Sequence, residues 1–246
     1  LGSVYGTRPN VINLGVDGET TSSFTTGMGR VPPDASYTDA ALAELNTHYT
    51  GLNPPTQASL LTSTIASEAA SGHVISNISI ALGSNDLFSL ALTNLHPSAA
   101  DLRLTLATYE SNYSSILTTI RASLPNATID LLSSYNPFTA VPSSQFAPLA
   151  GLAIPLLNQE TAALAGEFHA HYIDLYNTPL TTDAAEYTLI LNQGDVHPKF
   201  DKGYAVIASA IESVPEPSSV VLLTLGTGTV GLASWSVASR RRRTVS

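Results

Sequence analysis

The chain contains no cysteine among its 246 residues. A disulfide framework, a thiolate nucleophile and a zinc site with thiolate ligands are therefore excluded. Basic residues are also scarce, with 10 lysines and arginines against 19 aspartates and glutamates, and four of the ten are Arg240 to Arg243. Without that terminal run, the body carries 6 basic and 19 acidic residues, a formal net charge of −13. Such a body repels phosphate backbones, so we expect no nucleic-acid partner.

Charged residues make up only 12% of the sequence and hydrophobic residues 43%, which suits a globular core and argues against global disorder. The length favours one α/β domain with an appendage. The only methionine is Met28, so Leu1 is not a translation start. We therefore expect a processed product or a fragment, in which the lack of a visible secretory signal means little.

Short apolar runs alternate with helical patterns along the chain. Strands are predicted at residues 11–16, 74–82, 128–133 and 171–175. Helices are predicted at residues 39–45, 57–67, 99–124 and 146–168, the last broken near Pro155, and from Lys199 onward. This alternation predicts a mostly parallel sheet covered on both faces, whose ligands bind in loops beyond the carboxyl ends of the strands.

Three short polar stretches lie in loops of this kind. Asp17-Gly-Glu-Thr20 and Gly83-Ser-Asn-Asp86 each follow a predicted strand, and Asp195-Val-His-Pro198 precedes the last predicted helix. Histidine takes and returns a proton near neutrality, so His197 beside Asp195 is a candidate acid–base residue. Each stretch also has a simpler interpretation when taken alone. Gly18 is then an ordinary turn glycine, Asn85 caps the following helix, and His197 is a loop histidine.

The resemblance that groups these stretches begins slightly earlier in the chain, at Asn13. In this order and spacing, the second, third and fifth sequence blocks of the SGNH (GDSL-like) hydrolases resemble Asn13-Leu-Gly-Val-Asp-Gly-Glu-Thr20, Gly83-Ser-Asn-Asp86 and Asp195-Val-His-Pro198, and the resemblance spans residues 11–211. The resemblance implies a three-layer α/β/α fold with a flavodoxin-like parallel sheet. It also implies a serine that attacks an ester carbonyl, with His197 as general base. The backbone N–H of Gly18 and the side-chain N–H of Asn85 would hold the oxyanion, each donor being worth roughly 3–4 kcal/mol.

Two positions depart from the pattern of that family. The family commonly places its acid three residues before the histidine, where this chain has Gly194, so Asp195 is the available carboxylate. The Gly-Asp-Ser block is absent, and Ser3 fits poorly because no strand precedes it and few residues separate it from residue 11. We therefore expect the nucleophilic serine and a central strand upstream of Leu1. The chain as given should then be inactive and poorly folded.

The last thirty residues differ in chemistry from the body. Pro215-Glu-Pro217 is followed by a stretch without charge over residues 218–239, and then by four arginines. About 20 helical residues span roughly 30 Å, enough to cross a bilayer core. These features resemble the PEP-CTERM sorting signal, which implies export, an anchor through residues 218–239, a body outside the membrane, and cleavage by an exosortase. The alternative is a disordered or docked tail.

These patterns predict a hydrolase domain over residues 1–213 and a sorting segment over residues 214–246. Gly226-Thr-Gly-Thr-Val-Gly231 matches a dinucleotide fingerprint, but only fifteen residues follow it, too few for the rest of that fold. His169 and His171 share a strand face without a supporting metal motif, so we expect neither cofactor nor metal. The predicted function is an exported serine ester hydrolase acting on an acetylated polysaccharide or a lipid ester. The alternative is a non-catalytic glycan-binding module on the same fold.

Overall fold

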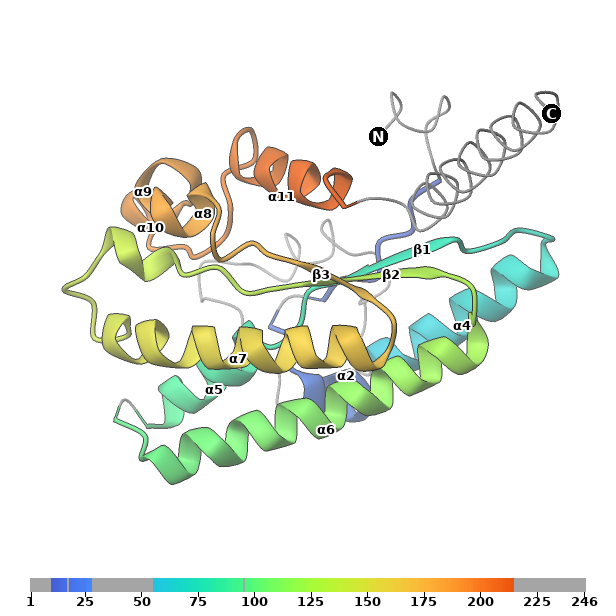
Figure 1. The fold of residues 1–246 in the computed structure, drawn as a ribbon, viewed down its shortest axis with the longest axis horizontal. Helices are drawn as coiled ribbons and strands as arrows, with labels where there is room; N and C mark the ends of the chain where they lie inside the picture. Colours follow the sequence, from blue (N-terminus) through green and yellow to red (C-terminus); the bar gives the residue numbers. More distant parts are fainter. Residues whose placement is uncertain (1–9, 17, 28–54, 95, 215–246) are drawn as a thin grey trace, which may run out of the picture.

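A three-stranded parallel sheet forms the centre of the computed structural model, which describes residues 10–16, 18–27, 55–94 and 96–214. Strands β1 (Asn77–Ile80), β2 (Thr128–Leu132) and β3 (His171–Ile173) lie in this order (Figure 1). Helices connect successive strands, as parallel pairing requires. The predicted α/β fold class is therefore confirmed.

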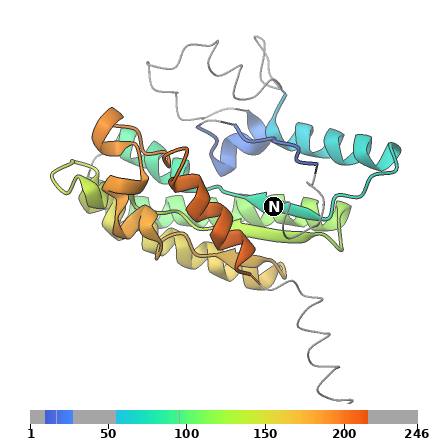
Figure 2. The same cartoon turned by 90° about the horizontal axis from the view of Figure 1, so that it is seen from above.

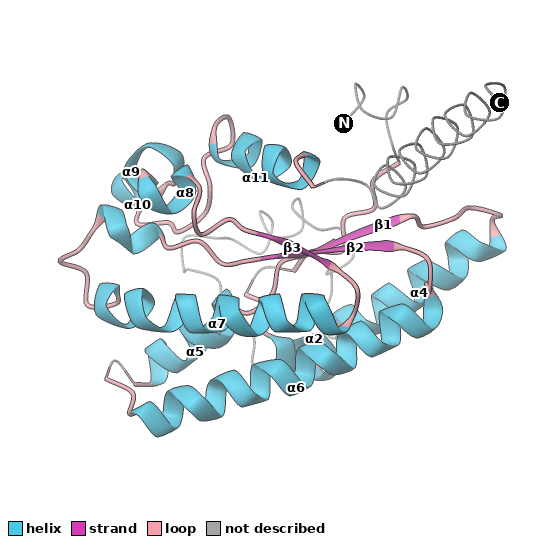
Figure 3. Ribbon diagram, viewed as in Figure 1, coloured by secondary structure: helices cyan, strands magenta, loops and turns pink. Residues whose placement is uncertain are grey.

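Helices lie on both faces of this sheet. Figures 1 and 3 show α6 (Ala99–Ser123) and α7 (Ala147–Glu167) beneath it and α11 (Gly203–Glu212) above it. Figure 2 shows α2 (Thr21–Thr26) and α4 (Gln57–Ala70) beyond β1, on the side away from α7. The remaining described elements are α5 (Ser84–Thr93), η2 (Pro137–Ala140), α8 (Pro179–Thr182), α9 (Ala184–Tyr187) and α10 (Ile190–Gln193). They cluster at the end of the sheet where β1 and β2 terminate.

The main core lies between the sheet and the two long helices. Its most deeply buried side chains are Tyr109, Tyr113, Leu117, Ile120, Ile129, Leu131, Leu157 and Leu164. On α6 these residues recur every three or four positions, which places them on one helical face. Burying one leucine or isoleucine fully contributes about 1.5–3 kcal/mol, so this face holds α6 against the sheet.

The helix at residues 146–168 is confirmed, but the predicted break near Pro155 is wrong. Helix α7 runs without interruption through Pro155. A proline inside a helix removes one backbone hydrogen bond, here the bond to the carbonyl of Gly151. Ala153 and Leu157, on either side of the proline, are fully buried, so packing holds the helix together. The strands predicted at residues 74–82 and 171–175 are present but shorter.

The buried strand predicted at residues 11–16 is also wrong. This segment forms no strand, and Val11 and Ile12 are 70% and 40% exposed. The side chain of Asn13 accepts a hydrogen bond from the N–H of Gly15 at 2.9 Å. Such a local bond competes with a sheet ladder. Within the described ranges no strand pairs with this segment, so an apolar run alone does not make it a strand.

Several predictions fall outside the part of the chain that the structure describes. They concern the helix at residues 39–45, Ser3 and the apolar stretch at residues 218–239. Within the described ranges, no helix is both long and apolar enough to cross a membrane. The membrane anchor therefore stays a prediction.

Gly83 shapes the junction between β1 and α5. Its φ is 113°, a value that favours glycine, and it is the N-cap of α5. A Cβ at this position would lie 2.6 Å from Cε2 of Tyr109 and 3.0 Å from Cδ2 of Leu157. Both neighbours are fully buried and have no room to move. The close turn into α5 therefore requires glycine.

We expect Gly83→Ala to lower the free energy of unfolding by about 2–5 kcal/mol, because backbone strain and overpacking add. The control is Gly151→Ala in α7, where an added Cβ meets nothing within 4 Å. It should be neutral or stabilise by up to about 1 kcal/mol. Thermal unfolding followed by circular dichroism measures both. Equal melting temperatures for the two variants would contradict the role assigned to Gly83.

Candidate functional site

Asn85 contacts the residue that follows Gly18, although 66 positions separate Asn85 from Glu19. Gly18 is buried, with a φ of 68°. Asn85 is the second residue of α5, and its Nδ2 donates a hydrogen bond to the carbonyl of Glu19 at 3.1 Å. Because Gly83 is the N-cap, the alternative that Asn85 caps this helix is wrong. The asparagine amide instead contacts the turn that contains Gly18.

A second contact fixes these two loops to each other. The carboxylate of Asp86 accepts hydrogen bonds from the N–H of Thr21 at 3.0 Å and from its hydroxyl at 2.6 Å. Burial raises the pKa of Asp86, while the two bonds from Thr21 act in the opposite direction. Thr20 caps α2 through a reciprocal capping box with Ser23. The loop after Gly18 is thus held by its own helix and by α5.

His197 and Asp195 form a pair. Their Nδ1 and Oδ1 atoms lie 2.5 Å apart, and the N–H of His197 donates to the same carboxylate oxygen at 2.9 Å. The side chain of His197 is 48% exposed and that of Asp195 is 16% exposed. A carboxylate at Nδ1 orients the imidazole and leaves Nε2 for proton transfer. The structure therefore brings together the two residues that the sequence singled out here.

The loop that carries this pair is anchored at both ends. Gly194, with a φ of 70°, ends α10, and the carbonyl of His197 accepts a hydrogen bond from the N–H of Leu189 at 3.0 Å. A Cβ on Gly203 would lie 2.5 Å from Cβ of Pro198, so α11 begins in close contact with the loop. The predicted last helix is confirmed, although it begins at Gly203 rather than at Lys199.

Hydrogen bonds connect the Gly18–Asn85 pair to the His197–Asp195 pair. The hydroxyls of Ser84 and Ser134 lie 2.7 Å apart. The hydroxyl of Tyr135 donates to the carbonyl of Val196 at 2.8 Å. Ser84 precedes Asn85, Tyr135 follows Ser134, and Val196 precedes His197. Two side-chain contacts therefore span the route from the oxyanion candidate to the histidine.

Buried groups hold the middle of this route in place. The side chain of Asn158 on α7 accepts from the N–H of Ser134 and donates to its carbonyl, both at 2.8 Å. Burial raises the pKa of Tyr135 well above its ordinary value, so its hydroxyl stays a hydrogen-bond donor. The roles of Ser134 and Asn158 were not predicted from the sequence. The available signal was a lone asparagine on the apolar face of a long helix.

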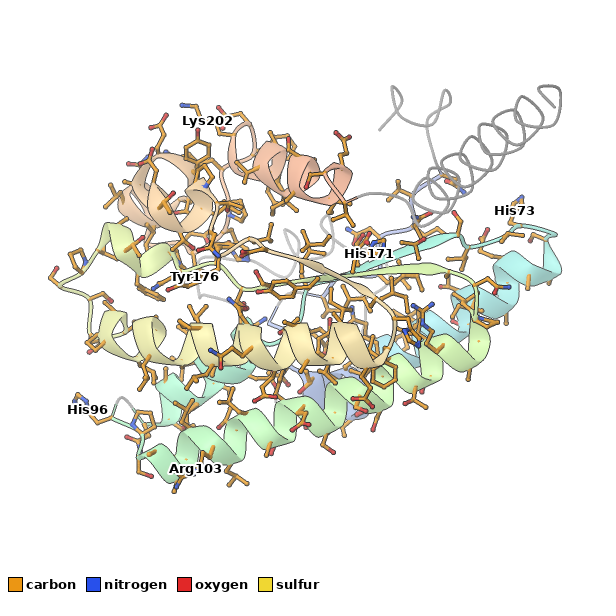
Figure 4. All side chains as sticks on the ribbon, viewed as in Figure 1. His73, His96, Arg103, His171, Tyr176 and Lys202 are labelled. Carbon is orange, nitrogen blue, oxygen red and sulfur yellow. The ribbon has the colours of Figure 1, made fainter. Side chains whose placement is uncertain are left out.

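Two further candidates from the sequence are the histidines near β3 and Ser3. His171 is labelled in Figure 4, and its Nδ1 lies 3.1 Å from Oδ1 of Asp130 on the neighbouring strand. No cluster of three metal-ligating side chains forms within the described ranges. Among those residues, no serine hydroxyl is hydrogen-bonded to His197. Ser3 lies outside them.

Solved structures resemble parts of the chain. A protein described as a GDSL-like lipase from Parabacteroides merdae is 22% identical over 55% of this chain and 58% of its own, with a TM-score of 0.39. An extracellular lipase from Streptomyces rimosus is 23% identical over 59% and 76%, with a TM-score of 0.39. An acetyl-xylooligosaccharide esterase from Geobacillus is 16% identical over 77% and 88%, with a TM-score of 0.41. At these values the likenesses carry no argument about activity.

No curated protein matches the chain. A sequence model of the GDSL-like Lipase/Acylhydrolase family, in contrast, matches residues 1–206. The matched range contains both loops of the oxyanion candidate, the histidine and its carboxylate. The chain belongs to the GDSL-like lipase/acylhydrolase family.

Proposed function

We propose that the protein is a carboxylic ester hydrolase whose site is built from Gly18, Asn85, Asp195 and His197. The observation that supports this most strongly is the pair of side-chain contacts, Ser84 to Ser134 and Tyr135 to Val196, that connects the two halves. A serine hydrolase needs oxyanion donors and a proton acceptor for the nucleophile around one reacting carbonyl group. The nucleophile in this proposal is a serine outside the described residues.

In this mechanism the serine oxygen attacks the ester carbonyl and His197 takes the serine proton. The carbonyl oxygen becomes an oxyanion, which accepts hydrogen bonds from Asn85 and from the N–H of Gly18. His197 then returns the proton to the leaving alcohol, and water releases the acid from the acyl-enzyme in a second round. Asp195 keeps the imidazole in place and stabilises its protonated form.

The oxyanion donors are held before substrate arrives. Nδ2 of Asn85 carries two hydrogens, and the carbonyl of Glu19 takes one of them. The other hydrogen is available to a substrate oxygen. Donors that are already oriented need not reorganise during the reaction. Their stabilisation of the oxyanion is therefore large in acyl transfer. Proposed substrates are an acetylated extracellular polysaccharide or a lipid ester.

We expect His197→Ala in the natural full-length protein to lower kcat/KM for 4-nitrophenyl acetate by about 10²–10⁴, the loss typical of a general base. Asn85→Ala should cost about 10²–10³. The matched control is His96→Ala, which removes an exposed loop histidine and should leave turnover unchanged. Full activity in His197→Ala would refute the assignment. A full-length protein that binds glycans without ester turnover would favour the non-catalytic module.

We further propose that the protein is exported and is held at a membrane through residues 218–239 until an exosortase acts near Pro215-Glu-Pro217. The support is the uncharged stretch between this segment and the run of arginines. Such a run stays on the cytoplasmic side, which places the hydrolase domain outside. The described part of the chain ends at Val214, just after α11.

Expressed with an export signal in a host without exosortase, the protein should sediment with membranes. Without cleavage, the apolar stretch remains inserted in the bilayer. Truncation after Val214 should move it to the soluble fraction. Replacing Arg240 to Arg243 by glutamate leaves the apolar stretch unchanged. This variant should still sediment with membranes, and only its orientation in the membrane should change. Equal solubility of the full and truncated proteins would exclude the anchor.

A further inference from the structure

A leucine-lined cleft lies between α6 and α7. It has a volume of about 300 Å³ and is lined chiefly by Leu102, Leu106, Leu149, Leu152, Leu156 and Arg103. This volume is at the lower end of the range typical of small-ligand pockets, about 300–1,000 Å³. Leu152 is 60% exposed, while Leu102 and Leu106 on the facing helix are buried. An open apolar surface of this kind gains free energy when an apolar group covers it.

Arg103 differs from the other basic residues that the structure describes. Arg121 donates hydrogen bonds to three backbone carbonyls, Lys199 to the carbonyl of Ala185, and Lys202 to the carboxylate of Glu186. Within the described ranges Arg103 makes no hydrogen bond or ion pair. It lies near the start of α6 (Figure 4) and is one of the residues that line the cleft. A guanidinium with five unused N–H donors suits a carboxylate.

A leucine-lined cleft with the unpaired guanidinium of Arg103 at its edge suits an anionic amphiphile. The aliphatic chain covers the leucines, and an anionic head pairs with Arg103. A neutral alkane would leave the guanidinium unused, and a cationic amphiphile would be repelled by it. The body as a whole is acidic, and Arg103 is the only charged residue among those that line the cleft.

We propose that this cleft is a binding site for a fatty carboxylate of medium chain length, with its chain against the leucines and its head group at Arg103. The choice of a carboxylate rests on the proposed function, because ester hydrolysis releases such an acid. The cleft is separate from His197 and Asn85, neither of which lines it. The site would therefore hold the product, or an acid of the same class, without taking part in bond cleavage.

The test measures binding and requires no turnover. Binding can therefore be absent in an active esterase, and it can be present in a protein without esterase activity. Calorimetric titration of the full chain with dodecanoate, below its micelle concentration, should show saturable binding. Dodecyltrimethylammonium has the same chain with the opposite charge and should bind at least 10-fold more weakly. Acetate, the head group alone, should show no saturation.

Two variants and a matched control locate the binding. Leu152→Glu puts a charge into the cleft and should weaken dodecanoate binding at least 10-fold. Arg103→Gln should weaken it about 3–5-fold, since an exposed ion pair is worth about 1 kcal/mol at most, and should reduce the preference over the cationic amphiphile. The control Leu104→Glu adds the same charge on α6 at a leucine that is 69% exposed and outside the cleft lining. It should change affinity by less than 2-fold.

Because Leu152 and Arg103 are exposed, both variants should keep their circular dichroism spectrum. Unchanged binding in Leu152→Glu, or equal binding of the anionic and cationic amphiphiles, would overturn the proposal. A dimer that Leu152→Glu dissociates, in a protein that binds no dodecanoate, would assign the cleft to a second copy instead. Light scattering distinguishes that outcome.

Discussion

The close approach of the chain at Gly83 to Tyr109 and Leu157 is the constraint on which the site depends. There is space for a hydrogen but not for a methyl group between this residue and two fully buried side chains. The backbone turns there with a φ that suits glycine, and α5 begins immediately afterwards. The next three residues each contact a different partner. Packing beneath the sheet thus sets the position of polar groups at its end.

Those three residues show how a small number of contacts orders a site. Ser84 contacts Ser134 at the end of β2, Asn85 contacts the turn after Gly18, and Asp86 contacts the start of α2. Partial burial of Asp86 disfavours its charge, and the hydrogen bonds from Thr21 offset part of that cost. A network in which the polar groups are paired is rigid. A rigid network around Asn85 and Gly18 lets their N–H groups bind an oxyanion without rearrangement.

The sequence predicted the long helices well, because a pattern sustained over many turns leaves little ambiguity. Helix α6 was predicted to within one residue of its observed end. The short apolar run at residues 11–16 was not a strand, since pairing depends on a neighbour that no local pattern supplies. Asn85 was ambiguous between a helix cap and an amide donor. What decides between them is Gly83, whose conformation depends on the distant side chains of Tyr109 and Leu157.

From the residues alone, contacts within the site could be predicted only between neighbours in the chain. Gly18 and Asn85 were assigned to one site by the resemblance to a family. Asp195 and His197 are two positions apart, and their contact followed from that spacing. Ser84 and Ser134 are fifty positions apart, and Tyr135 and Val196 are sixty-one apart. Such contacts depend on strand order and on loop geometry at the end of the sheet. The sequence therefore indicated the components of the site, and the fold supplied the connection between them.

The central claim is that Gly18, Asn85 and His197 act on one carbonyl group. A crystal structure of the natural full-length protein, inhibited covalently by a small alkyl phosphonate ester, tests this directly. We predict that the phosphonyl oxygen accepts hydrogen bonds of about 2.7–3.1 Å from Nδ2 of Asn85 and from the N–H of Gly18. Nε2 of His197 should then lie within hydrogen-bond distance of the modified serine oxygen. A phosphonyl oxygen that faces solvent away from Asn85, or a modified serine beyond the reach of His197, would contradict the account.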